Sequence, residues 1–383
     1  MTELSLGGRN IVFLFGSFDL GGAEQQGLLL ADHLHATHGA DVKVLALDPR
    51  PGRLSHLCDQ RGIPWKGIPF HWGLSRRWYY LPQAIAALRA EKADVLISST
   101  CVPNLVSAIG RRLVNAKLSV WRQEDEGLLM NRLPLHRWAV RQPHCFISNS
   151  SGGRRFLVDT YGIPEQKVHL IRNGITLSAP LQQRDQWRAE LGLPDNAPVA
   201  CMVANLSRYK DHETLLRAWR LVTEARYGAS PVLLLAGRFD DAAQRLRALA
   251  AELNLADSIR LLGPVADVSG LLHAVDLFAY SSRSEGIPNA VLEAMAAGLP
   301  VVGTAIPGIL EAVGAEGAAF LAPVGNHAAM AEKICLLLEN APLRNEYGSI
   351  LRQRAVSLFS QEQMFSASCQ LIASALAALE TPR

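Results

Sequence analysis

The stretch of sequence that decides the fold is residues 277–298, LFAYSSRSEGIPNAVLEAMAAG. Its apolar start predicts a buried strand, the polar residues that follow predict a loop, and Pro288 is well placed in the first turn of a helix that Gly298 ends. A strand therefore leads through a loop into the N-terminus of a helix. The free N–H groups and the positive end of the helix dipole favour phosphate oxygens at such a terminus.

Two carboxylates flank this predicted anion site, Glu285 just before the helix and Glu293 one turn inside it. A carboxylate beside a bound diphosphate is repelled unless it has hydroxyl groups from which to accept hydrogen bonds. The ligand that fits is therefore a sugar-like polyol attached to phosphate. Two solvated surface glutamates are the ordinary alternative, but the strand, the Gly-x-Pro turn and the helix end agree with one another and favour the sugar-nucleotide site.

The segment from Glu285 to Glu293 resembles the Glu-x₇-Glu motif of the retaining glycosyltransferases of family four. This resemblance implies the GT-B fold, an α/β architecture of two Rossmann-like, doubly wound parallel-sheet domains that face a central cleft. It also implies that Glu285 contacts the donor sugar and that Glu293 binds the ribose hydroxyls. We place Gly286, Ile287 and Asn289 in the same donor-binding segment.

The rest of the chain shows the alternation of strands and helices that this fold requires. With 383 residues and 49% hydrophobic content, the chain is long enough for two domains with substantial cores. The apolar run at residues 11–15 has no polar residue at alternate positions, which indicates a parallel sheet covered on both faces. The predicted strands are residues 10–15, 41–47, 94–99, 117–121, 145–148 and 168–172, and then 199–204, 232–236, 259–262, 277–280, 300–303 and 318–321.

A polar connection around one short helix, residues 177–197, divides the two series of strands. We expect an N-terminal acceptor-side domain over residues 1–180 and a C-terminal domain that binds the nucleotide sugar over residues 181–360. The Ala-rich end of the chain, residues 361–381, predicts an amphipathic helix. In the resembled fold the final helix, here residues 361–383, crosses back to the first domain.

A glycine-rich loop follows the first predicted strand. Residues 16–24 lead into a helical stretch at 25–38, and Gly21 and Gly22 permit a diphosphate to approach the backbone N–H groups at the helix start. The spacing is not Gly-x-Gly-x-x-Gly, which argues against a nicotinamide cofactor, and a plain turn is the alternative for an isolated Gly-Gly pair. Family four commonly has Gly-Gly-Ala-Glu here, which residues 21–24 match.

Cationic residues at the start of the second domain are candidates for neutralising the departing diphosphate. Residues 205–210 link a predicted strand to a helix over 211–226, and we expect Lys210 to face the cleft. The resembled family has an Arg and a Lys five residues apart that bind the diphosphate. Lys210 matches this Lys, but Asn205 occupies the Arg position. Arg208 is the candidate substitute, and an exposed arginine at a helix entry is the alternative.

Two further loops resemble the nucleotide pocket of the family. Gly237 and Arg238 follow a predicted strand and would line this pocket, and Val265 would lie beside the base. Related enzymes often hold the base through main-chain groups. The sequence therefore does not decide between UDP, GDP and ADP as the nucleotide of the donor.

Many family members carry a His after the fourth strand of the first domain, where this chain has Arg122. A guanidinium donates hydrogen bonds to sugar or phosphate but cannot act as a base. We therefore assign Arg122 to the catalytic residues, together with Glu285 and Lys210. Glu124 or Asp125 is the candidate base for an acceptor hydroxyl, and capping of the next segment is their alternative role.

Charge is unevenly distributed along the chain. Residues 1–180 carry 21 Lys/Arg and 14 Asp/Glu, a net charge of +7, whereas residues 181–383 carry 17 and 21, a net charge of −4. A basic first domain suits a phosphorylated acceptor or an anionic membrane surface, and a scatter of solvated arginines is the equally ordinary alternative. Residues 76–80 and 128–144 mix basic and apolar side chains and are candidates for weak peripheral contact with a membrane. Aromatic side chains that face the core are the alternative.

The six cysteines are widely spaced and form no Cys-x-x-Cys pair. The histidines show no metal-ligand spacing. No signal peptide is evident, and no apolar run approaches the roughly 18 residues that span a bilayer. We expect a cytoplasmic protein, for which peripheral contact at the inner face of the membrane is an option. We expect no metal or other cofactor, and no nucleic acid as a partner.

These features together predict a metal-independent, retaining glycosyltransferase of hexosyl or N-acetylhexosaminyl type. The donor is a nucleotide diphosphate sugar, and the resembled family favours a glycan or lipid-linked acceptor of cell-envelope polysaccharide or lipopolysaccharide synthesis. A GT-B sugar-nucleotide epimerase is one alternative. Another is a non-catalytic protein that binds sugar nucleotides or glycans, which Asn205 and the absence of the family His make conceivable. A dehydrogenase is a third option, which neither glycine loop supports.

Overall fold

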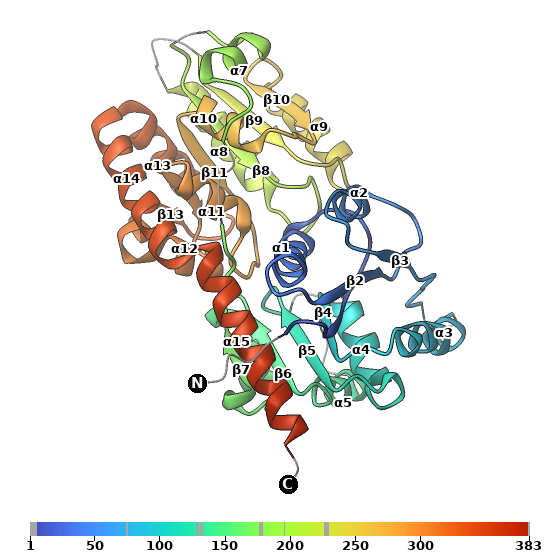
Figure 1. Cartoon of the computed structure of the whole chain (residues 1–383). Helices are drawn as coiled ribbons and strands as arrows, with labels where there is room; N and C mark the ends of the chain where they lie inside the picture. Colours follow the sequence, from blue (N-terminus) through green and yellow to red (C-terminus); the bar gives the residue numbers. More distant parts are fainter. Residues whose placement is uncertain are drawn as a thin grey trace. The chain divides into compact units, whose positions relative to one another are not determined.

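The computed structural model describes residues 6–73, 76–127, 130, 133–175, 179–194, 196–225 and 230–381 (Figure 1). The chain divides into two compact units. Unit 1 comprises Met1–Gly174 together with Gln361–Arg383, and unit 2 comprises Ile175–Ser360. Each unit is built on one parallel sheet. The expected fold class, two Rossmann-like α/β domains, is therefore confirmed.

The sheet of unit 1 has seven parallel strands. They are β1 (Asn10–Phe15), β2 (Asp41–Ala46), β3 (Trp65–Gly67), β4 (Val95–Ser99), β5 (Leu118–Gln123), β6 (Cys145–Ser148) and β7 (Val168–Leu170). Their order across the sheet is β3-β2-β1-β4-β5-β6-β7, so the chain order reverses between β1 and β4. In open parallel sheets of this kind, ligands bind at the carboxyl ends of the two strands where the order reverses.

Helices cover both faces of this sheet. They are α1 (Gly22–Ala36), α2 (Arg53–Gln60), α3 (Arg77–Ala90), α4 (Cys101–Val114), α5 (Pro134–Val140), α6 (Ser151–Arg155) and α15 (Gln361–Glu380). Ile11 and Phe13 of β1 pack into a core with α1, α2 and α15, whereas Val12 and Leu14 pack into a second core with α3 and α4. Alternate residues of one apolar strand therefore face two different cores, which explains why the strand has no polar face.

The sheet of unit 2 has six parallel strands. They are β8 (Val199–Val203), β9 (Val232–Ala236), β10 (Ile259–Gly263), β11 (Leu277–Tyr280), β12 (Val301–Thr304) and β13 (Leu321–Ala322). Their order is β10-β9-β8-β11-β12-β13, which reverses between β8 and β11. The helices of this unit are α7 (Arg184–Glu190), α8 (His212–Glu224), α9 (Ala243–Glu252), α10 (Val268–Ala274), α11 (Asn289–Ala296), α12 (Pro307–Gly317), α13 (His327–Glu339) and α14 (Ala341–Leu358).

The structure corrects several predicted element boundaries. The predicted strand at 318–321 is wrong, because Ala318–Phe320 form a 3₁₀ turn and β13 covers two residues only. The short edge strand β3 was not predicted from the apolar pattern, since three residues carry too little periodicity. Pro288 is the N-cap of α11 rather than a residue of its first turn. Within the segment 128–144, α5 is the helix that the structure has, and residues 128, 129, 131 and 132 lie outside the described residues.

Membrane spanning can be judged only for the residues that the structure describes. None of the helices there is long and apolar enough to cross a bilayer.

The start of α12 packs directly against the loop between β11 and α11. A Cβ atom at Gly308 would lie 1.5 Å from the carbonyl oxygen of Gly286, so only glycine permits this contact. Thr304, at the end of β12, holds the other end of the loop, because its Oγ1 accepts from the N–H of Ser282 at 3.0 Å and donates to the Ser282 carbonyl at 2.7 Å. The backbone around Glu285 is therefore fixed by neighbouring elements of the same unit.

Gly308→Ala should destabilise unit 2 by at least about 2 kcal/mol, because the new methyl group meets backbone and forces α12 to move. Urea unfolding followed by circular dichroism measures the effect. Leu310→Ala, which truncates an exposed side chain of the same helix, should cost less than about 1 kcal/mol. Equal effects of the two substitutions would contradict the close approach of α12 to Gly286.

Candidate active site

Lys210 and Glu285 meet at the point where the strand order of unit 2 reverses. Lys210 follows β8 and Glu285 follows β11, and the Lys210 Nζ donates a hydrogen bond to Glu285 Oε1. The two loops are joined by backbone as well. An isolated antiparallel bridge pairs Lys210 with Ser282, and the N–H of Asp211 donates to the Ser281 carbonyl at 3.1 Å. The sheet therefore brings together two residues that are 75 positions apart in the sequence.

The described residues donate three hydrogen bonds to the Glu285 carboxylate, and all three go to the same oxygen, Oε1. Besides Lys210, the Tyr280 hydroxyl donates to Oε1 at 3.1 Å and the Ser282 hydroxyl donates to it at 2.8 Å. Lys210 Nζ also donates to the Tyr280 hydroxyl at 2.9 Å. These contacts fix the orientation of the carboxylate through Oε1 and leave Oε2 for another donor.

The charges of this cluster follow from its burial and its contacts. Burial lowers the pKa of Lys210, but its interactions with Tyr280 and Glu285 outweigh burial, and the net direction is upward. Burial raises the pKa of the Tyr280 hydroxyl, and the Glu285 charge raises it further. Lys210 is therefore an ammonium and Tyr280 a neutral phenol at neutral pH.

The loops after β8, β9 and β10 lie along the same edge of the sheet. The Oδ1 of Asn205 accepts a hydrogen bond from the backbone N–H of Arg238 at 3.1 Å, and the N–H of Gly237 donates to the Gly263 carbonyl at 2.8 Å. Gly237 has φ +154°, and a Cβ atom there would lie 2.0 Å from the carbonyl of Ala204. Asn205, at the position where the family has Arg, thus ties two loops together.

The other residues predicted to bind the donor in unit 2 follow β8, β9 and β10 or lie in the loop after β11 and in α11. Arg208 is exposed, forms an ion pair with Asp241 at 3.6 Å and stacks over Tyr209 at 5.1 Å. The Arg238 guanidinium donates to Asp240 at 2.7 Å. The remaining candidates are Gly286, Ile287 and Asn289, which are buried, and Val265 and Glu293, which are partly buried.

Unit 1 contains a second polar cluster, at the carboxyl end of β5. Arg122 is 5% exposed and forms an ion pair with Glu124 at 2.8 Å. The side chain of Asn149 donates to the other oxygen of Glu124 at 3.1 Å, and the side chain of Asn104 donates to the Arg122 carbonyl at 2.8 Å. Asp125 accepts from the N–H of Gly127 at 2.8 Å within its own loop, and its role as a base or as a cap stays a prediction.

Glu24 is a candidate that the sequence reasoning named only as part of a motif. Burial raises its pKa to about 7, backbone N–H groups including that of Gly21 oppose this shift, and the charge of Glu124 adds to it. Gly21 is the N-cap of α1, and a Cβ atom there would lie 2.7 Å from Glu24 Oε2. The glycine therefore leaves room for this carboxyl group, which can exchange a proton near neutral pH. The Gly-Gly-Ala-Glu match was the signal that could have found it.

His212 is the first residue of α8, two positions after Lys210 in the sequence, and is 1% exposed. Burial lowers the pKa of His212 to about 4, the Lys210 ammonium lowers it as well, and Asp211 partly opposes the shift. The imidazole is therefore neutral in the folded protein at neutral pH.

Comparison with known proteins decides the family. The model for glycosyl transferases group 1 matches residues 183–354, and the model for glycosyltransferase family 4 matches residues 20–179. The chain belongs to glycosyltransferase family 4. The resemblance inferred from residues 285–293 is confirmed, and the protein is a glycosyltransferase.

Similarity to individual proteins supports this family 4 assignment. The D-inositol 3-phosphate glycosyltransferase of Kineococcus radiotolerans is 28% identical over 346 residues, which cover 85% of this chain and 78% of that protein. The N-acetylgalactosamine-N,N'-diacetylbacillosaminyl-diphospho-undecaprenol 4-alpha-N-acetylgalactosaminyltransferase of Campylobacter jejuni is 29% identical over 211 residues, which cover 55% of this chain and 54% of that enzyme.

A solved structure shows the same fold. HepE of Anabaena, crystallised with UDP and glucose, has a TM-score of 0.83 at 21% identity, and the match covers 96% of this chain and 100% of that chain. The roles of individual residues in this family 4 glycosyltransferase stay predictions, including those of Gly21, Gly22 and Arg122 in unit 1.

The neutral, buried His212 predicts a loss of stability in mild acid. The unfolded chain takes up a proton near pH 6.5, whereas the folded protein takes it up near pH 4, so stability falls as the pH falls through this window. At pH 5 the loss relative to pH 8 is about 2 kcal/mol. Urea unfolding at both pH values should show this loss in the wild type and in His327→Leu, which changes an exposed histidine, and a smaller loss in His212→Leu. An unchanged pH dependence in His212→Leu would contradict the account.

Proposed function

We propose that the protein transfers a sugar from a nucleotide diphosphate sugar to an acceptor hydroxyl with retention of the anomeric configuration. The observation that carries this proposal is the Glu285 carboxylate, whose Oε1 is held by Lys210, Tyr280 and Ser282. A carboxylate fixed through one oxygen can accept hydrogen bonds from sugar hydroxyls with the other, without an entropic cost for ordering itself.

Lys210 supplies positive charge beside this carboxylate. Its ammonium group has three N–H bonds, of which two point to Glu285 and Tyr280. The third can donate to a phosphate oxygen of the donor and stabilise the charge that develops on the leaving diphosphate. The N-terminus of α11, directly after the same loop, adds the partial positive charge of its backbone N–H groups. These groups would perform without a metal the task that a divalent cation performs in other transferases.

Retention without a covalent intermediate requires that the acceptor attacks from the face that the diphosphate leaves. In the mechanism that we propose, a diphosphate oxygen takes the acceptor proton as the new glycosidic bond forms and the bond to the phosphate breaks. Glu285 positions the sugar, and Glu293 binds the ribose hydroxyls. This assignment gives each carboxylate a hydroxyl partner and leaves neither facing phosphate alone.

A phosphorylated or lipid-linked acceptor of cell-envelope glycan synthesis is the class that we propose. The names of two relatives contain inositol phosphate and diphospho-undecaprenol, and residues 1–180 carry a net charge of +7. Trp78, Tyr79 and Trp138 are 72%, 66% and 48% exposed, so the alternative that such aromatics face the core is wrong for these three. Peripheral contact with an anionic membrane stays a prediction, which sedimentation with anionic vesicles would test.

Product analysis tests the transferase function. Purified protein is incubated with UDP-, GDP- and ADP-sugars and with inositol phosphate or polyprenyl-diphosphate sugars, and both nucleotide release and the new glycoside are measured. Glu285→Gln should lower kcat/KM by about 10²- to 10³-fold, because it removes a charged group that contacts the reacting sugar. Glu332→Gln, which changes an exposed carboxylate on α13, should leave kcat/KM unchanged. An isomerised sugar nucleotide without a new glycoside, or binding without turnover, would overturn the proposal.

A further inference from the structure

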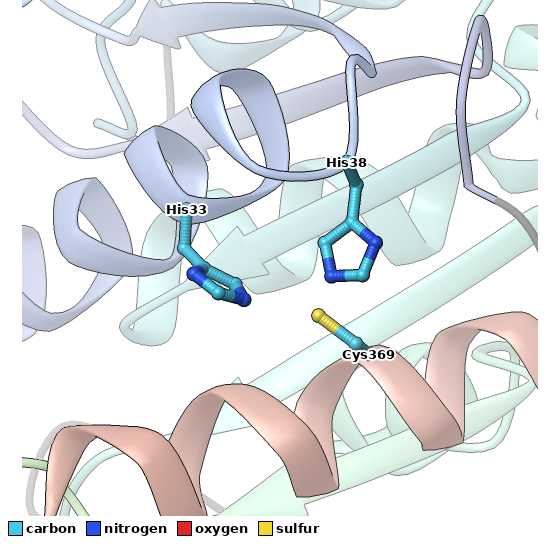
Figure 2. A group of neighbouring side chains, drawn as sticks. All are labelled: His33, His38 and Cys369. Atoms are coloured by element: carbon cyan, nitrogen blue, oxygen red, sulfur yellow. The ribbon is translucent and has the colours of Figure 1, made fainter.

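Unit 1 brings together three side chains that bind metals in many proteins, His33, His38 and Cys369. His33 lies in the last turn of α1, His38 follows that helix directly, and Cys369 lies on α15. One ligand atom of each residue lies within 4.8 Å of those of the other two. Figure 2 shows the two imidazole rings and the thiol facing one another between α1 and α15.

Packing holds these side chains in place. The ring of His33 stacks on Phe365, with centroids 4.2 Å apart and planes 7° from parallel, and Phe365 lies one turn before Cys369 on α15. The rings of His33 and His38 meet edge to face at 5.2 Å. The Thr37 hydroxyl lies 3.3 Å from His33 Nδ1. A hydrogen bond between these two atoms leaves Nε2 as the metal ligand and fixes the ring, as residues bonded to metal-binding histidines do.

We propose that His33, His38 and Cys369 form a Zn²⁺ site. Two imidazoles and a thiolate are a donor set that suits Zn²⁺, and a water molecule would complete a tetrahedron. Bond lengths of about 2.0–2.1 Å to nitrogen and about 2.3 Å to sulfur place tetrahedral ligands about 3.3–3.6 Å apart. The three ligand atoms lie within 4.8 Å of one another, so metal binding would draw them together by no more than about 1.5 Å.

Binding releases the thiol proton of Cys369 to solvent, so that the thiolate forms the bond to the metal. The cysteine is 8% exposed, and the metal reaches it from the side of the two partly exposed histidines. Asp32, the neighbouring carboxylate on α1, forms an ion pair with Arg61 at 3.1 Å, so we do not include it among the metal ligands.

The site would tie the last helix of the chain to α1 in unit 1. His33 is 11 residues beyond Gly22, which at about 1.5 Å per residue puts the site roughly 16 Å along α1 from the glycine loop. The metal is therefore structural in this proposal and takes no part in sugar transfer. The inference does not rest on the proposed function, because it concerns stability and metal binding only.

Zinc titration tests the site. Untagged protein is treated with a chelator, desalted and titrated with Zn²⁺ in competition with a chromophoric chelator. We expect about one Zn²⁺ per chain and a rise in the unfolding midpoint on binding. Cys369→Ser and His38→Gln should each weaken binding at least about 100-fold, since removing even a residue that only supports a ligand costs 10- to 100-fold. Co²⁺ should give a thiolate charge-transfer band that Cys369→Ser abolishes.

Matched variants control for other thiols and imidazoles. Cys335→Ser changes a partly buried cysteine of unit 2, and His56→Gln changes an exposed histidine on α2. Both should bind Zn²⁺ as the wild type does. Circular dichroism with chelator present checks that each variant is folded. If Cys369→Ser does not fold, His38→Gln, which changes a partly exposed residue, is the deciding variant. No saturable Zn²⁺ binding to the wild type, or binding that His38→Gln leaves unchanged, would overturn the proposal.

Discussion

The ion pair between Lys210 and Glu285 is the interaction on which the rest of the candidate site depends. It connects the loops after β8 and β11, the two strands between which the order of the sheet in unit 2 reverses. Both side chains are mostly buried, with 21% and 15% of their surface exposed. Loss of one member of a buried pair typically costs about 3–5 kcal/mol, because the other charge is left without a partner. The pair therefore fixes the positions proposed for phosphate and sugar together.

The surrounding residues keep this pair in one geometry. Tyr280 and Ser282 donate to the same carboxylate oxygen as Lys210 does, and Thr304 holds the backbone of Ser282. The contact of Gly308 with the Gly286 carbonyl fixes the loop from the side of α12. A ligand that binds here meets groups that are already oriented, which lowers the entropic cost of binding and of reaching the transition state.

Much of the fold could be predicted from the sequence, because parallel strands buried on both faces have continuous apolar runs. Residues 10–15, 145–148, 232–236 and 277–280 form the strands that these runs indicate. The edge strands were harder, since β3 and β13 are too short to carry a pattern. The Glu-x₇-Glu motif located the loop, but the pattern could not show that one oxygen of Glu285 would bind three donors, which depends on how β8 and β11 pair. The cluster of His33, His38 and Cys369 was missed, because its cysteine follows its histidines by more than 300 residues.

The central claim is that Lys210, held by Glu285, binds the diphosphate of the donor. Its most direct test is the unfolding midpoint of the wild type, Lys210→Gln and Arg217→Gln, each with UDP, GDP, ADP and NAD. Arg217 is an exposed cation on α8 and serves as the control. A ligand at about 100 times its dissociation constant stabilises the fold by about 2.7 kcal/mol. We expect one nucleoside diphosphate to raise the midpoint of the wild type and of Arg217→Gln, and to raise that of Lys210→Gln much less. A response to NAD alone, or an equal rise in all three proteins, would contradict the claim.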